Sequence, residues 1–268
     1  MSALSPSESA RRRSVVKSDR PPAPRLGGAI RAAGGDFYHH SLRLVAANLV
    51  WGLMFSVVLL GGLAWPPILL LSPLLTLPTI GIFRLAALIQ RDEFVALSDA
   101  FIAWRRLGRR ALAMGTGLLL CMLVFGTNIY LGLSRGDYPG LALATMALWG
   151  FVVTVVCSCV LWPLAADPRR ETLPVAEIVR LGFLLVIAFP VRFARLALVV
   201  AVIMIISVPE YAGLVSVSVA FVALLAARYV LPAADRFAPP PPIADPETQP
   251  AEDGDGHLTS AIGAARPR

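Results

Sequence analysis

The chain has 268 residues, of which 57% are hydrophobic and 15% are charged, and its mean hydropathy is +0.71. Soluble domains carry about a quarter charged residues, so this composition excludes a protein that faces water on all sides. The net charge of +7 comes from basic residues that flank apolar runs and do not form one patch, which argues against nucleic-acid binding. The sequence therefore predicts an all-α, polytopic transmembrane helical bundle.

The N-terminal part is expected to hold a tail and the first span. Residues 1–36 are rich in Ser, Pro, Arg, Gly and Ala and lack apolar periodicity, which predicts a disordered basic tail. The transmembrane domain is expected over residues 37–234. Its first span is predicted at residues 44–65, whose 22 uncharged residues suffice to cross a hydrocarbon core about 30 Å thick.

The second span is predicted at residues 68–90 and is expected to be kinked or discontinuous. Pro66-Pro67 should end the preceding helix, because proline lacks an amide donor and clashes with the preceding turn. Pro73, Pro78 and Gly81 are candidate positions of a structural break within the span. Broken backbone at membrane depth is tolerated where protein or a cavity surrounds it, so we expect Pro73 to Gly81 to pack against other helices.

Two amphipathic surface helices are predicted at the cytoplasmic side. The first covers residues 94–110, where apolar and basic residues occupy different faces. Spans three and four should follow at residues 111–133 and 141–164. The second surface helix is predicted at residues 173–189 and is interrupted by Pro190. Candidate contacts for a partner or for lipid on these segments are Arg105, Arg106, Arg109, Arg110, Arg192 and Arg195.

The last two spans are expected at residues 196–209 and 211–231. The first of them has only 14 uncharged residues, so the arginines before it must reach back to the interface. Residues 235–268 contain a four-proline run and several acids, which predicts a disordered, Pro-rich acidic tail.

A weak internal repeat accompanies this order. A span, a charged link containing a glutamate, a surface helix and a further span occur twice, and the two glutamates, Glu93 and Glu171, are 78 residues apart. Chance similarity between membrane segments is the alternative explanation.

The arginines predict the orientation. Cytoplasmic loops carry an excess of Lys and Arg, and a six-span arrangement with both termini inside places 23 of the 24 basic residues on that side or next to it, leaving Arg135 outside. A five-span alternative would place Arg228 and Arg236 outside. Because only one basic residue is lysine and Ala and Pro are abundant, we expect a bacterial inner-membrane protein.

The residues that carry chemistry form no recognisable site. No H-E-x-x-H, G-x-S-x-G or P-loop motif occurs, and the three histidines and three cysteines lack metal-ligand spacing. The sequence therefore predicts no enzymatic activity, no metal and no cofactor. Arg84 and Glu210 are charged residues within or beside spans, and we expect Arg84 at the interface and Glu210 in a turn.

Several short motifs carry a resemblance to a known family. They are Asn48-Leu-Val-Trp51, Thr76-Leu-Pro-Thr-Ile-Gly81, Arg91-Asp-Glu93, Asp99-Ala-Phe101, Asn128-Ile-Tyr130, Arg180-Leu-Gly182 and Pro190-Val-Arg192. Over residues 37–232 the chain resembles the YesL-like family of bacterial integral membrane proteins. It departs from the family pattern in Pro66-Pro67, in the Ile-Phe pair after Gly81 and in its long polar tails. The resemblance implies a membrane protein without established biochemical activity, often encoded near carbohydrate-uptake systems.

The leading functional hypothesis is a non-enzymatic membrane protein that is accessory to solute uptake, with carbohydrate as the solute that the resemblance implies. Its expected partners are the lipid bilayer and a membrane transporter complex. The alternative is a permease-type subunit that forms the pathway itself: Ala176-Glu177…Gly182 is faintly similar to a coupling helix of ABC permeases, although the spacing to Pro190 is too short. A third alternative, a membrane enzyme acting on lipid or cell-wall precursors, lacks an acid/base pair.

Overall fold

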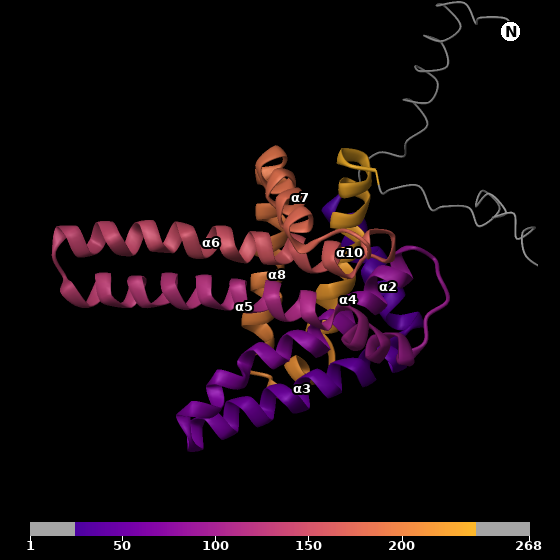
Figure 1. Cartoon of the computed structure of the whole chain (residues 1–268), viewed down its shortest axis with the longest axis horizontal. Helices are drawn as coiled ribbons and strands as arrows, with labels where there is room; N and C mark the ends of the chain where they lie inside the picture. Colours follow the sequence, from indigo (N-terminus) through magenta and orange to yellow (C-terminus); the bar gives the residue numbers. More distant parts are fainter. Residues whose placement is uncertain (1–24, 240–268) are drawn as a thin grey trace, which may run out of the picture.

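The computed structural model describes residues 25–239, and within that range it contains helices and no strand. Three helical hairpins follow one another along the chain and are joined by charged links (Figure 1). The elements are α2 (Leu26–His39), α3 (Ser41–Ala64), η1 (Pro66–Leu75), α4 (Thr76–Gln90), α5 (Leu97–Arg135), α6 (Tyr138–Ala166), η2 (Pro168–Arg170), α7 (Val175–Ala188), α8 (Pro190–Ser207), α9 (Tyr211–Gly213), η3 (Leu214–Ser218) and α10 (Val219–Phe237).

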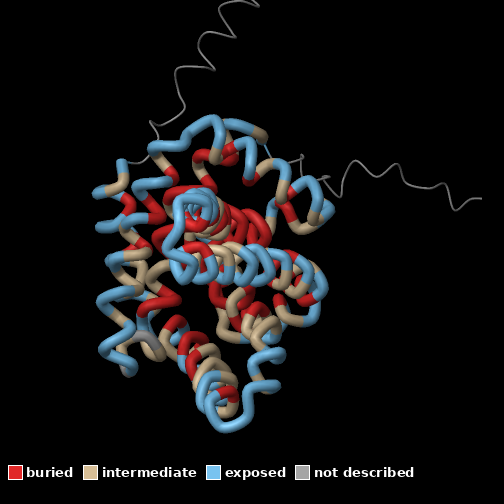
Figure 2. The backbone as a smooth tube through the Cα atoms, turned by 90° about the vertical axis from the view of Figure 1, so that its left-hand side faces the viewer, coloured by how far each residue is buried: buried red, intermediate tan, exposed pale blue. Residues whose placement is uncertain are grey.

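Six of the described helical segments are long and apolar enough to cross a membrane, which confirms the predicted all-α bundle of six spans. They are Ser41–Ala64, Pro66–Gln90, Leu97–Arg135, Tyr138–Ala166, Pro190–Ser207 and Val215–Phe237. Large apolar side chains such as Leu123 and Trp149 project outward from them and are about two-thirds exposed. Figure 2 shows this exposure along the α5–α6 hairpin. Such a surface is unfavourable in water, and a membrane-embedded protein accounts for it.

The α5–α6 hairpin extends beyond the rest of the molecule (Figure 1). Its turn uses Gly136 at φ 69°, a conformation that glycine adopts without steric cost. Asp137 then caps α6, where its side chain accepts a hydrogen bond of 2.7 Å from the Gly140 amide. A Cβ atom on Gly132 would lie 2.5 Å from the Gly140 carbonyl oxygen, so small residues let the two helices approach closely.

Helix α10 is the central helix of the bundle. In the most apolar 18-residue stretch of its span, 72% of the residues are buried, and it packs against α2, α4 and α6. Alanines such as Ala223, Ala226 and Ala227 line its core and allow several helices to surround it. Together, α9, η3 and the first half of α10 run antiparallel to α2 and α3. Arg228 contacts Asp36, Ala220 contacts Asn48 and Tyr211 contacts Ser56.

Both predicted tail boundaries are wrong. Residues 26–36, predicted as disordered, belong to α2, because Ala29 and Ala33 are buried one helical turn apart. Asp36 of the same helix accepts two hydrogen bonds from Arg228, at 2.6 and 2.8 Å. At the other end, residues 235–237 complete α10. The remainder of the predicted tails lies outside the described residues.

The two predicted surface helices have different outcomes. The second is a separate helix, α7, which ends before Pro190 begins α8, and its place at the cytoplasmic side stays a prediction. The first is not a separate helix, because residues 97–110 are the opening turns of the 39-residue α5. No proline interrupts α5, whereas Pro190 lacks the amide that a continuous α7–α8 helix would require.

The second span is discontinuous, as predicted, but only one half of it is irregular. Trp65 is extended, residues 66–75 form a 3₁₀ segment, and regular α-helix starts at Thr76. The Thr76 hydroxyl donates to the Pro73 carbonyl at 2.6 Å, so a carbonyl at the junction is satisfied internally. Pro78 and Gly81 are buried within α4 as predicted, but neither breaks it, since Pro78 sits in its first turn, where helix amides lack partners.

Candidate functional site

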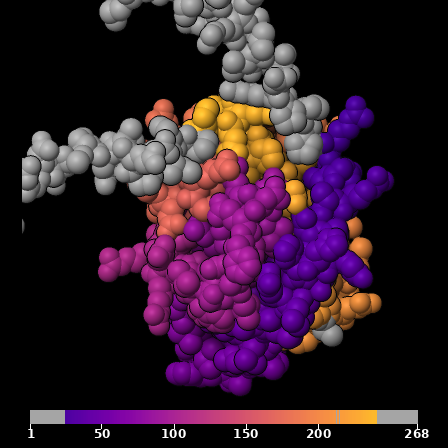
Figure 3. All heavy atoms as spheres, turned by 90° about the vertical axis from the view of Figure 1, so that its right-hand side faces the viewer, coloured from indigo at the N-terminus to yellow at the C-terminus, as the bar shows by residue number. Residues whose placement is uncertain are grey.

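The charged links gather at one end of the bundle, which we call the charged base: the last turns of α4, α6 and α10, the first turns of α5, and η2. Figure 3 views the molecule from this end and shows α5, α10 and the α2–α3 segment meeting on one face. Seven charged residues of the base contact one another or nearby carbonyls: Arg84, Arg91, Arg110, Asp167, Arg170, Glu171 and Asp235. Arg135 lies at the far tip of the α5–α6 hairpin.

Four of these residues form a nearly buried ionic quartet: Arg91, Asp167, Arg170 and Asp235. Arg91 Nη2 lies 2.7 Å from Asp167 Oδ2 and 3.1 Å from Asp235 Oδ1. Arg170 Nη1 lies 2.7 Å from Asp167 Oδ2 and 2.9 Å from Asp235 Oδ1. Each arginine thus bridges both carboxylates, and the quartet ties α4 and η2 to the end of α10.

The quartet is electrically neutral and its charges are well satisfied. Burial alone would lower the pKa of Arg91, but the hydrogen bonds and charges of Asp235 and Asp167 outweigh it, and the pKa lies above its usual value. Arg91 therefore stays charged at any physiological pH. Buried ion pairs add little net stability, but losing one partner leaves an uncompensated charge, so the quartet fixes which helices meet at the base.

Two further arginines anchor the segment after α6. Arg110 of α5 donates from Nη2 to the Glu171 carbonyl at 2.7 Å, and its other contacts are the carbonyls of Leu173, Ala165 and Arg170. Arg84 of α4 pairs with the Glu171 carboxylate at 2.9 Å. Arg84 thus lies in the second half of α4 and forms an ion pair, and its place at the membrane interface stays a prediction.

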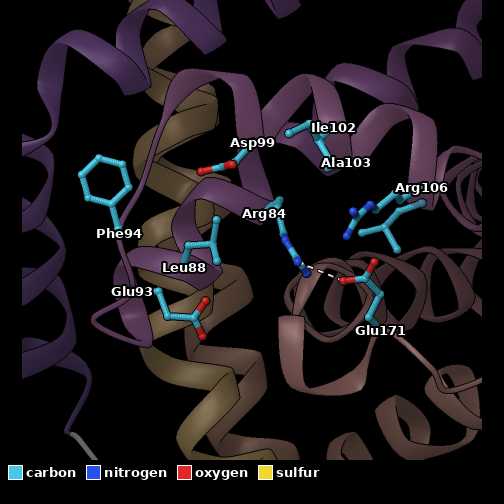
Figure 4. A pocket seen from close by; sticks show the side chains of 10 residues that line it. Arg84, Leu88, Glu93, Phe94, Asp99, Ile102, Ala103, Arg106 and Glu171 are labelled. Carbon is cyan, nitrogen blue, oxygen red and sulfur yellow. Dashed lines mark hydrogen bonds and ion pairs between the residues drawn. The ribbon is translucent and has the colours of Figure 1, made fainter. Parts of the chain in front are cut away.

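A pocket of about 330 Å³ opens beside this pair (Figure 4). It is lined by charged and apolar side chains from α4, α5 and the two charged links: Arg84, Leu88, Glu93, Phe94, Asp99, Ile102, Ala103, Arg106, Leu107 and Glu171. Asp99 Oδ2 accepts the Ala96 amide at 2.7 Å and so caps α5. Within residues 25–239, Glu93 and Arg106 have no ion-pair partner.

The predicted partner or lipid contacts divide into two groups. Arg105, Arg106, Arg109 and Arg195 are exposed. Arg110 is used inside the fold, and Arg192 lies 4.4 Å from the centre of the Tyr229 ring and donates to the Tyr229 carbonyl at 3.2 Å. The last two therefore have structural roles, and the role of the exposed four stays a prediction.

Sequence reasoning did not identify the pocket or the quartet. In the sequence, Glu93 and Glu171 stand out as the repeated glutamates, and Glu93 also ends the Arg91-Asp-Glu93 motif; both line the pocket. The internal repeat was the sequence feature that could have indicated the pocket. If the two charged links lie at the same end of the bundle, their glutamates can lie close together. Asp235 carried no signal, since it is 144 residues from Arg91.

A second, apolar cavity of about 190 Å³ lies where η1–α4 meets α5 and α6. Trp51, Thr76 and Thr79 are among its lining residues. The Trp51 indole donates to Thr79 Oγ1 at 3.0 Å, and Thr79 Oγ1 donates to the Leu75 carbonyl at 2.7 Å. These hydrogen bonds satisfy polar groups at the start of α4, so the cavity belongs to the discontinuous second span.

Comparisons of the chain with protein-family models, with curated proteins and with solved structures found no match. The resemblance to the YesL-like family therefore stays a prediction.

Proposed function

We propose that the chain is a non-enzymatic accessory protein of the bacterial inner membrane, with its charged base and both termini in the cytoplasm, that docks a component of a solute-uptake system. The observation that carries this proposal is the division of the basic residues at the base. Arg91, Arg110 and Arg170 are held by internal partners, whereas Arg105 and Arg109 are exposed, as is Arg195 of α8 outside the base. Exposed arginines beside a rigid frame suit an acidic partner surface.

The polar groups of the spans support the same proposal. Asn48 contacts η3 and α10, Trp51 contacts Thr79, and Ser207 contacts Ser218. These contacts join helices of this chain to one another, which is the structural use of polar groups in a membrane bundle. Carbohydrate as the solute comes from the YesL-like resemblance alone.

The test compares three versions of the chain in a deletion strain. The triple variant R105Q/R109Q/R195Q removes exposed charge from the base and from the start of α8, and R135Q removes the arginine at the tip of the α5–α6 hairpin. We expect wild-type protein and R135Q to co-purify uptake components from native membranes and to support sugar uptake, while the triple variant does neither. Normal uptake in the deletion strain, with no uptake component in the wild-type purification, would refute the proposal.

A permease-type subunit that forms its own pathway is the second candidate. The observation that favours it is the ten-residue 3₁₀ segment η1 within the second span, beside the apolar cavity. Discontinuous helices recur at the substrate sites of transporters. Purified protein in liposomes should then move a labelled sugar without any other subunit, and an accessory protein should not.

A further inference from the structure

The pocket at the charged base holds two opposite charges that form no ion pair with the described residues. Arg84 and Glu171 neutralise each other, and Asp99 is partly occupied as the cap of α5. Glu93 and Arg106 line the same pocket and have no ion-pair partner among the described residues. Figure 4 shows Glu93 and Asp99 on one side of Arg84 and Arg106 on the other.

This arrangement selects one class of ligand. A purely anionic ligand would meet Glu93 and Asp99, and a purely cationic ligand would leave Arg106 unpaired. A zwitterion can place its anion at Arg106 and its cation at the carboxylates. Arginine matches a phosphate well because its guanidinium donates two parallel hydrogen bonds.

The cation should be a primary ammonium. Quaternary ammonium groups are bound by cages of several aromatic rings, and Phe94 is the only aromatic residue among those that line this pocket. Carboxylates instead accept hydrogen bonds, which a primary ammonium donates and a quaternary one lacks. Phe94 and Ile102 at the pocket are 87% and 45% exposed, so apolar surface adjoins the charges.

We propose that this pocket binds a phosphate ester that carries a primary ammonium, with the phosphate at Arg106 and the ammonium at Glu93 and Asp99. Two sources offer that chemistry: the headgroup of phosphatidylethanolamine and free phosphoethanolamine. The apolar rim favours the lipid. A pocket of about 330 Å³ is within the usual range for a small-molecule site.

The test measures binding of short-chain lipids to the full chain in mild detergent, by native mass spectrometry and by the shift of the unfolding temperature. Phosphatidylethanolamine should bind at least about tenfold more tightly than phosphatidylcholine or phosphatidylglycerol. E93Q and R106Q should each weaken that binding about tenfold, the factor that one lost charge-assisted hydrogen bond of about 1.4 kcal/mol represents. The controls D92N and R135Q change exposed residues outside the pocket and should bind like wild type.

Equal binding of the three lipids would overturn the proposal, as would pocket variants that bind like the controls. Competition by free phosphoethanolamine, lost in E93Q and R106Q, would support the site with a soluble ligand. Binding of the lipid without such competition would support the membrane source. Tight phosphatidylglycerol binding that depends on Arg106 and not on Glu93 would contradict the proposal, because it describes a simple anion site.

Discussion

Asn48 of α3 accepts a hydrogen bond of 3.0 Å from the amide of Ala220 in α10, 172 residues along the chain. The same side chain donates to the Val215 carbonyl at 2.6 Å. Val215 lies in the π-helical segment η3, and Ala220 is five residues later. In a π-helix, the Ala220 amide would donate to the Val215 carbonyl. The Asn48 side chain takes the place of that hydrogen bond by contacting both groups. One buried side chain thus holds the irregular start of α10 against α3.

Replacing Asn48 should therefore destabilise the bundle. N48A leaves a part-buried carbonyl and a buried amide without this partner, and we expect a loss of about 2–4 kcal/mol in the free energy of unfolding. Denaturant unfolding in detergent micelles measures it. The control is N128A, because Asn128 donates only to the Val124 carbonyl of its own helix, and its change should stay within about 0.5 kcal/mol. Equal stability of the two variants would contradict the bridging role.

The ionic quartet predicts a second destabilisation. D167N removes one of two carboxylates that neutralise Arg91 and Arg170, and breaking such a buried pair costs about 3–5 kcal/mol. The exposed R109Q serves as the control and should unfold like the wild type. If D167N unfolded like R109Q, the quartet would not hold the base together.

The α5–α6 hairpin offers a matched pair of glycine substitutions. G132A brings a Cβ atom to 2.5 Å from the Gly140 carbonyl oxygen, and we expect it to cost about 1–3 kcal/mol. G126A meets nothing within 4 Å on the same helix, and it should be neutral or stabilise the protein by up to about 1 kcal/mol through helix propensity. Thermal unfolding of both variants checks the opposite signs.

Labelling of single cysteines tests the orientation. In a background with Cys121, Cys157 and Cys159 replaced by serine, we expect R135C to react with an impermeant reagent added to intact spheroplasts. A238C should react only after the membrane is opened, because the six-span arrangement places the end of α10 on the other side. Reaction of both positions from outside would favour an odd number of spans.

The span positions were predictable because each follows from a local property, the length of an uncharged run. The α2 helix was missed because its burial depends on a distant surface: the alanines and glycines of residues 26–36 show little apolar periodicity until α10 lies beside them. The continuity of α5 was not predicted, because the polar residues of its first turns suggested a separate surface helix.

The site was less predictable than the fold. Arg110 and Arg192 were grouped with the exposed arginines. The sequence does not reveal that their guanidinium groups donate to backbone carbonyls of distant segments. Glu93 and Glu171 could be related through the repeat, but their meeting at one pocket depends on how the helices pack. Contacts between residues that are far apart in the chain set these roles.

Site-specific photo-crosslinking in living cells tests the docking role of the charged base most directly. A photoreactive amino acid at position 109 lies on the exposed part of the base, and one at position 135 lies at the opposite tip of the bundle. We expect an adduct with a component of a solute-uptake system from position 109 and none from position 135. Such an adduct from position 135 alone, or from neither position, would contradict the docking role.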